Sequence, residues 1–167
     1  HLETDLRCNQ TIARRQPIAI DLREIIAVLH INNDLERIGD EAKKIALKSR
    51  AFEASGGLPI PAERVEEMTG IVVEMLRGAL DAYIRHDTDG AKAVAARDDE
   101  VDALRDALIG ELMERISGTP GIVSQALAMI FVVQSIERAG DHAKNIAEYV
   151  VHVVEGSDVR HQPGTRA

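Results

Sequence analysis

Apolar residues recur at intervals of three and four positions through most of the 167-residue chain. This spacing is typical of amphipathic helices, which bury one stripe of their surface. One such stripe near the C-terminus consists of Met129, Val132, Val133, Ile136, Gly140, Ala143, Ala147 and Val150. No segment shows the strict alternation of a half-buried strand. The pattern therefore predicts an all-α fold in which helices pack side by side as a bundle.

Residues that favour turns divide the chain into five predicted helices. The breaks fall at Gln16-Pro17, at the Gly- and Pro-rich stretch 55–61, at 86–90 and at 117–120, because Gly and Pro interrupt helical periodicity. The predicted helices cover residues 2–14, 18–50, 62–86, 89–116 and 120–155. The polar residues 157–167, which follow Gly156, are expected to form a frayed tail.

The chain also contains an internal repeat. Residues 36–46 read ERIGDEAKKIA and residues 137–147 read ERAGDHAKNIA, with eight of eleven positions identical at an offset of 101 residues. A repeat of this period indicates a duplicated domain. We therefore expect residues 62–156 to form one three-helix bundle, residues 1–54 to be the remnant of another, and residues 55–61 to link them. Gly39 and Gly140 of the repeat are expected where helices approach closely.

Composition narrows the function. The net charge is −8, with the excess acid in residues 59–167, and the aromatic residues are two Phe and two Tyr without Trp. An acidic chain with few stacking residues is a poor nucleic-acid binder. No apolar run reaches the length of a membrane span, and the single Cys8 fits a reducing compartment. These features predict a cytoplasmic protein that neither binds nucleic acid nor inserts into the membrane.

The repeated Glu-x-x-x-Asp is the main candidate for chemistry. Glu36 and Asp40, and likewise Glu137 and Asp141, lie one helical turn apart beside the apolar stripe. Asp98 and Asp102 have the same spacing on the preceding helix, so two ladders of carboxylates could face each other. Such oxygen-rich sites suit Mg, Ca, Mn or Fe. These six carboxylates are the predicted metal ligands, at the rim of the core and not inside it.

Several alternatives remain beside the metal site. Neighbouring Lys and Arg could neutralise the acids, and the run from Asp98 to Asp102 could be a solvated helix start, where acids favour the helix dipole. His142 is predicted to lie on the surface. No nucleophile–base pair, phosphate-binding Gly-rich loop or basic pocket is visible. We therefore do not expect an enzyme, and the sequence does not imply phosphate binding.

The repeat resembles the signature of the PhoU family. The resemblance rests on residues 34–46 and 136–148, on Arg15–Arg23 ahead of the first motif, and on the acidic stretch 98–102. It implies tandem three-helix bundles in a cytoplasmic accessory protein of phosphate uptake. It also implies negative regulation of the phosphate-starvation response through contacts with the transporter's ATPase subunit and a sensor histidine kinase. Some members of this family carry iron or zinc clusters on such motifs.

The first bundle departs from the family pattern. The chain begins part-way along the expected middle helix, so the Glu36/Asp40 site would lack half of its ligands. The apolar face of helix 18–50 would also lack its cover; it comprises Ile25, Val28, Leu29, Leu35, Ile38, Ala42 and Ile45. Because a bare stripe of that length promotes association, we expect a homodimer or larger oligomer. The alternative function is a structural bundle, or a metal-binding or storage protein, without regulatory contacts.

Overall fold

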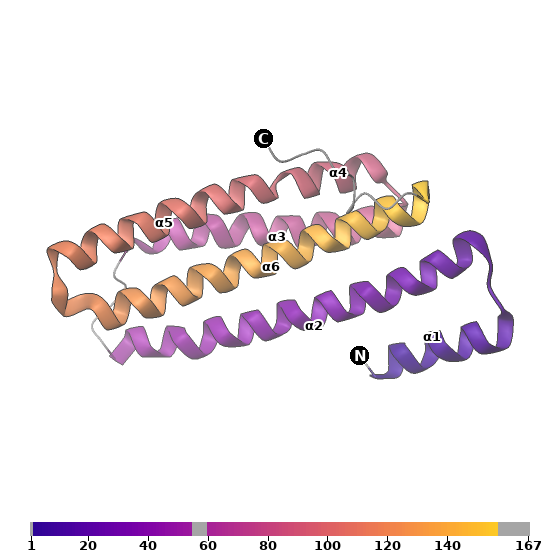
Figure 1. Ribbon diagram of the computed structural model, residues 1–167, viewed down its shortest axis with the longest axis horizontal. Helices are drawn as coiled ribbons and strands as arrows, with labels where there is room; N and C mark the ends of the chain where they lie inside the picture. Colours follow the sequence, from indigo (N-terminus) through magenta and orange to yellow (C-terminus); the bar gives the residue numbers. More distant parts are fainter. Residues whose placement is uncertain (1, 55–59, 157–167) are drawn as a thin grey trace.

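In the computed structural model, which describes residues 2–54 and 60–156, the chain forms six α-helices and one short 3₁₀ turn (Figure 1). No strand occurs in these residues, so the predicted all-α fold is confirmed. The elements are α1 (Leu2–Arg15), α2 (Ala19–Ala54), α3 (Ala62–Arg85), α4 (Thr88–Ala96), α5 (Asp98–Gly118), η1 (Pro120–Ile122) and α6 (Val123–Glu155). None of the described helices is sufficiently long and apolar to span a bilayer.

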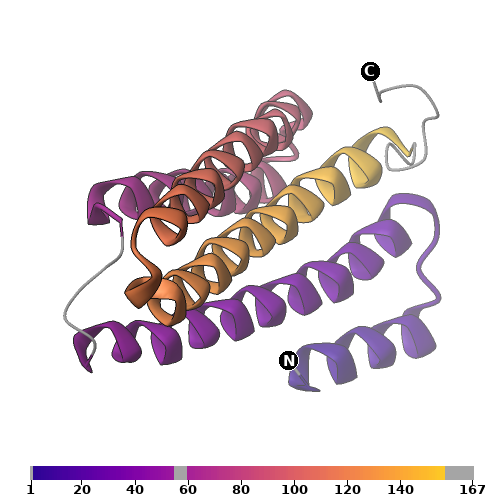
Figure 2. The same ribbon diagram turned by 60° about the vertical axis from the view of Figure 1, so that its left-hand side comes forward.

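Helix α6 is the centre of the arrangement. It packs against α2 on one side and against α3, α4 and α5 on the other, while α1 packs only on α2 (Figures 1 and 2). The predicted stripe of α6, from Met129 to Val150, is buried throughout. Because α6 is covered on two sides, it also buries residues outside that stripe, such as Ile146 and Val153.

The main hydrophobic core lies between α3, α5 and α6. Met68 and Met75 of α3, Leu108 and Leu112 of α5, and Met129 of α6 are almost fully buried there. A second cluster joins α3, α4 and α6 to α2 through Ile31. The C-terminal helices therefore supply most of the apolar core, and α2 is added to their outer side.

The apolar stripe of α2 does not stay bare. Ile38 and Ile45 pack against the main core, and Ile31 is buried against α6. The prediction of a fully uncovered face is wrong in this respect, because α2 turns part of that face onto α6. The large apolar side chains that α2 leaves exposed are Ile20, Ile26, Leu35 and Leu47. Association of two copies through α2 stays a prediction.

The predicted helix 89–116 is in fact two helices. Helix α4 ends and α5 begins at Arg97, whose guanidinium donates hydrogen bonds to Glu74 of α3 and to Glu100. The next residue, Asp98, is buried and reaches Lys144 of α6. Neither Gly nor Pro marks this break, so no local signal predicts it. The first turn of α5 contains Asp98, Asp99 and Glu100, which lie at the positive end of the helix dipole. This placement agrees with the alternative that the acidic run marks the start of a helix.

Helices α2 and α6 run antiparallel, and their contacts follow the sequence repeat. Asp34 of α2 contacts His142 of α6. At the offset of 101 residues, Asp34 corresponds to Ser135 and Glu41 corresponds to His142. Ser135 and Glu41 also contact each other. In the same way, His30 stacks on Tyr149, and their counterparts Phe131 and Lys48 form a cation–π contact. The two repeats are therefore related across this interface by an approximate two-fold axis, as two subunits are in an isologous dimer.

The two glycines of the repeat lie in different surroundings. A Cβ added to Gly140 would touch Val72 and Val101 at 3.4 and 3.5 Å, which confirms a close helix approach there. A Cβ added to Gly39 would meet nothing within 4 Å. The prediction of close approach is therefore wrong for Gly39, because no helix covers that face of α2 in the described residues.

We expect the substitution Gly39→Ala to stabilise the fold by about 0.5–1 kcal/mol, because Ala loses less conformational entropy than Gly in a helix and has room here. Urea unfolding followed by circular dichroism would measure this change. Gly78→Ala is the matched contrast: its Cβ would lie 2.8 Å from a methyl group of Val94, so it should destabilise. Equal effects of the two substitutions would contradict this account.

Candidate functional site

The predicted carboxylates of α5 and α6 lie together along the contact between these two helices. Asp98 and Asp102 come from α5, and Glu137 and Asp141 from α6, because their spacing places each pair on one helix face. Asp98 is only 6% exposed, so the prediction of a rim position is wrong for this residue. It is buried because the break at Arg97 turns the start of α5 onto α6.

Two basic side chains of the protein neutralise these carboxylates. Nη1 of Arg105 donates to Asp102 Oδ1 and to Glu137 Oε1, both at 2.7 Å, and its Nε donates to Asp106 at 3.0 Å. Lys144 Nζ donates to Asp98 Oδ2 at 2.5 Å. Arg105 is largely buried, with a side-chain exposure of 25%. It joins three carboxylates from two helices through charge-assisted hydrogen bonds, which offset the cost of removing its charge from water.

Asp141 is the carboxylate that these cations balance least. Partial burial and repulsion by Glu137, Asp98 and Asp102 raise the pKa of Asp141, and the nearby charge of Lys144 offsets this only in part. The ionised form of Asp141 is therefore disfavoured in the folded protein. A bound cation would reverse that effect.

The side chains as they stand do not form a metal site. Within residues 2–54 and 60–156, no group of three or more His, Cys, Asp or Glu is placed to hold a metal ion. The reason is visible at Arg105 and Lys144, whose nitrogens lie where a cation would have to bind the acidic oxygens. Metal binding at Asp98, Asp102, Glu137 and Asp141 stays a prediction that requires these basic groups to move.

The first copy of the motif has a different environment. Glu36 and Asp40 are exposed on α2, and α5 does not pack on that helix in the described residues. Asp98 and Asp102 of α5 face Glu137 and Asp141, but no described residues of α5 face Glu36 and Asp40. Metal binding at this pair also stays a prediction.

Buried polar residues between α2 and α6 form a second part of the site that the sequence did not reveal. His142 Nδ1 lies 2.8 Å from Asp34 Oδ1, and Asp34 is 5% exposed. The prediction that His142 lies on the surface is therefore wrong, because α2 covers it. The internal repeat could have predicted this contact, because an antiparallel alignment of its two copies places Asp34 opposite His142.

Glu41 is the buried counterpart of this contact. Burial favours the neutral acid, but hydrogen bonds from Lys44 and Ser135 and the charges of Lys44 and Arg138 outweigh it and lower the pKa of Glu41. Its Oε1 accepts from Lys44 at 2.7 Å, whereas its Oε2 is buried without a partner. The ionised carboxylate of Glu41 is thus buried next to Lys44 and Ser135.

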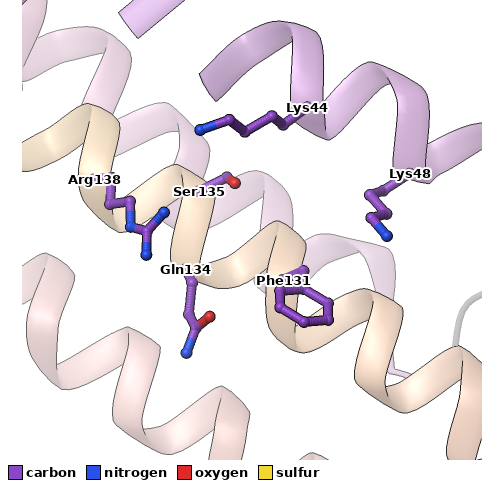
Figure 3. A pocket seen from close by; sticks show the side chains of 6 residues that line it. All are labelled: Lys44, Lys48, Phe131, Gln134, Ser135 and Arg138. Atoms are coloured by element: carbon purple, nitrogen blue, oxygen red, sulfur yellow. The ribbon is translucent and has the colours of Figure 1, made fainter. Parts of the chain in front are cut away.

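A hollow of about 310 Å³ opens between α2 and α6 beside Glu41 (Figure 3). We call this space the basic hollow. It is lined by Lys44 and Lys48 from α2 and by Phe131, Gln134, Ser135 and Arg138 from α6. This hollow is not visible in the sequence alone. Lys44 and Lys48 lie one turn apart on α2, and only the pairing of α2 with α6 brings the distant Arg138 to them.

The basic hollow adjoins the carboxylates. A second hollow, of about 450 Å³, lies between α5 and α6 and is lined by Arg105, Asp106, Ile109, Gln134, Glu137, Arg138 and Asp141. Gln134 and Arg138 line both hollows. Opposite charges are thus held side by side along one stretch of α6.

Comparison with known proteins shows similarity over almost the whole chain. The family described as PhoU domain matches residues 1–48 and 65–150. A phosphate-specific transport system accessory protein PhoU homolog of Pseudomonas aeruginosa is 42% identical over 162 residues, covering 97% of this chain and 67% of the relative. The homolog of Pseudomonas putida is also 42% identical, covering 94% of this chain and 61% of the relative. The chain thus spans about two thirds of the length of these relatives.

Solved structures agree with this similarity. The crystal structure of PhoU from P. aeruginosa matches with a TM-score of 0.88 at 40% identity, over 92% of this chain and 73% of that one. The phosphate transport system regulatory protein PhoU from Streptococcus pneumoniae matches with a TM-score of 0.84 at 25% identity, over 92% of this chain and 72% of that one.

We expect Asp141→Asn to stabilise the protein at about pH 7 by roughly 0.5 kcal/mol, the upper range for one like-charge pair on a helix. The gain should disappear as the pH falls through the raised pKa of Asp141, because the protonated wild-type side chain no longer repels its neighbours. Urea unfolding at several pH values would measure both effects.

The matched control for this substitution is Asp40→Asn, at the equivalent position of the first motif. Asp40 has no facing carboxylates from α5, so its gain should be smaller. An Asp141→Asn gain that equals the Asp40→Asn gain, or that persists in acid, would contradict the role given to the facing carboxylates.

Proposed function

The chain belongs to the PhoU family, and from that premise we propose that it is a regulatory accessory protein of high-affinity phosphate uptake. The observation that carries this proposal is the 42% identity to an accessory protein of the phosphate-specific transport system across 97% of the chain. In the proposal the protein acts in the cytoplasm through protein contacts and not as an enzyme. Its expected effect is negative regulation of the phosphate-starvation response.

The proposed partners are the ATPase subunit of the phosphate transporter and a membrane sensor histidine kinase. The long exposed faces of α2 and of the carboxylate-bearing helices provide polar surface for such contacts. Polar and charged surfaces are typical of interfaces that form and dissociate repeatedly, as regulation requires. The helical core underneath would hold these faces in a constant arrangement.

A strain that lacks its own PhoU-family protein and carries a phosphate-starvation reporter would test the regulatory role. We expect this chain to restore repression of the reporter in phosphate-rich medium, and to co-purify with the ATPase subunit or the kinase. Met75→Asp, which places a charge in the core and should unfold the bundle, is the control for a folded protein. Full reporter activity despite normal levels of folded protein would refute the regulatory role.

We also propose that the carboxylates of α5 and α6 bind a divalent or trivalent cation in competition with Arg105 and Lys144. Support comes from the raised pKa of Asp141, which shows that negative charge is incompletely balanced there. Iron or zinc follows from the family resemblance, whereas the oxygen ligands would equally suit Mg, Ca or Mn.

Elemental analysis of protein purified without chelator would test this second proposal. We expect little metal in the wild type, more in Arg105→Gln because a competing cation is removed, and none in the double variant Asp102→Asn/Asp141→Asn. Glu36→Gln/Asp40→Asn serves as the control at the other motif. Equal metal contents in Arg105→Gln and in the Asp102→Asn/Asp141→Asn variant would contradict the proposed site.

A further inference from the structure

The basic hollow between α2 and α6 gathers positive charge on a protein whose net charge is −8. Lys44 is paired with the buried Glu41, whereas Lys48 and Arg138 form no ion pair with the side chains that the structure describes. Lys44, Lys48 and Arg138 bring three positive charges to the basic hollow, which Glu41 and the carboxylates that adjoin Arg138 in the second hollow offset only in part. We propose that the basic hollow binds a phosphoryl group as a dianion, carried either by free phosphate or by a phosphate monoester such as a nucleotide.

The neutral residues of the hollow favour phosphate over other dianions. Ser135 lies beside Glu41, whose pKa it helps to lower, and the oxygen of its hydroxyl can accept a hydrogen bond from a ligand. The amide of Gln134 can both donate and accept. The hydrogen phosphate dianion carries an O–H that such acceptors can bind, whereas sulfate and the dianion of a phosphate monoester carry none. The mixture of cations and acceptors therefore selects a protonated oxyanion.

The repeat supplies an internal comparison. At the positions equivalent to Lys44, Lys48 and Arg138, the other half of the interface carries Asn145, Tyr149 and Arg37. Two of the three charges are missing there, although the backbone arrangement is related by the approximate two-fold axis. The positive charge is thus a property of one groove and not a general consequence of pairing α2 with α6.

Phe131 distinguishes the two possible sources of the phosphoryl group. Its side chain is 55% exposed at the edge of the hollow, and Lys48 Nζ lies 5.3 Å from the centre of its ring (Figure 3). An exposed aromatic ring beside phosphate-binding cations can stack with a nucleobase. Free phosphate would gain nothing from this ring.

Isothermal titration calorimetry on the full chain at constant ionic strength would test the proposal with phosphate, sulfate and AMP. We expect phosphate or AMP to bind, and sulfate to bind at least about tenfold more weakly. The double variant Lys48→Gln/Arg138→Gln should lose about tenfold or more in affinity, since two charge-assisted contacts disappear. Arg37→Gln, the matched control in the equivalent groove, should bind like the wild type, and circular dichroism would verify that all variants fold.

The same titrations decide the source and can overturn the site. AMP that binds more tightly than phosphate, with the excess lost in Phe131→Ala, would identify a nucleotide. AMP that binds no better than phosphate would identify the free ion. Absence of binding by both at millimolar concentration, equal binding of sulfate, or unchanged affinity in Lys48→Gln/Arg138→Gln would refute the proposal. The measurement needs no partner protein, so its failure would leave the proposed regulatory contacts standing.

Discussion

The antiparallel packing of α2 on α6 is the contact on which the rest of the structure depends. It covers one side of the central helix, and it also buries polar groups that must find partners there. Asp34 meets His142, and Glu41 meets Ser135 and Lys44. A shift of α2 by one helical turn would separate Asp34 from His142 and Glu41 from Ser135, and a buried Asp34 without its partner would cost several kcal/mol. The polar contacts therefore define the register between the two repeats, which apolar packing alone would specify less strictly.

The other side of α6 shows how local cations can replace a metal. Four carboxylates converge from α5 and α6, and such a group repels itself strongly in a partly buried place. Arg105 binds three acidic side chains, Asp102, Asp106 and Glu137, with hydrogen bonds of 2.7 to 3.0 Å, and Lys144 binds Asp98. Arg105 and Lys144 thus balance part of the negative charge that α5 and α6 bring together. Asp141 is the place where this internal compensation is incomplete.

The helices and the central stripe could be predicted from the sequence because they depend on periodicity and on Gly and Pro breaks. The family resemblance likewise rested on a local motif. What could not be predicted depends on contacts between distant segments. The break at Arg97 arises from partners on α3 and α6, and the burial of His142 arises from α2. Gly39 and Gly140 have identical positions in the repeat, yet only Gly140 has a neighbouring helix.

The same dependence explains why the basic hollow escaped prediction. Lys44 and Lys48 lie about ninety residues from Arg138 along the chain, and their separate motifs look like ordinary solvated helix faces. Within each repeat the spacing carries no hint that the two helices will face each other. The repeat contained the necessary information, but only together with an antiparallel alignment of its two copies.

The approximate two-fold axis between α2 and α6 has a consequence for how such a protein can change over time. In a dimer of identical subunits every substitution appears twice, so a groove cannot gain a charge without its twin gaining it too. Joining both copies in one chain removes that constraint, and each side then accumulates its own residues. His30 and Tyr149 form an aromatic stack at the positions where Phe131 and Lys48 form a cation–π contact. A duplication within one chain can thus carry two different surfaces on the same antiparallel packing of α2 on α6.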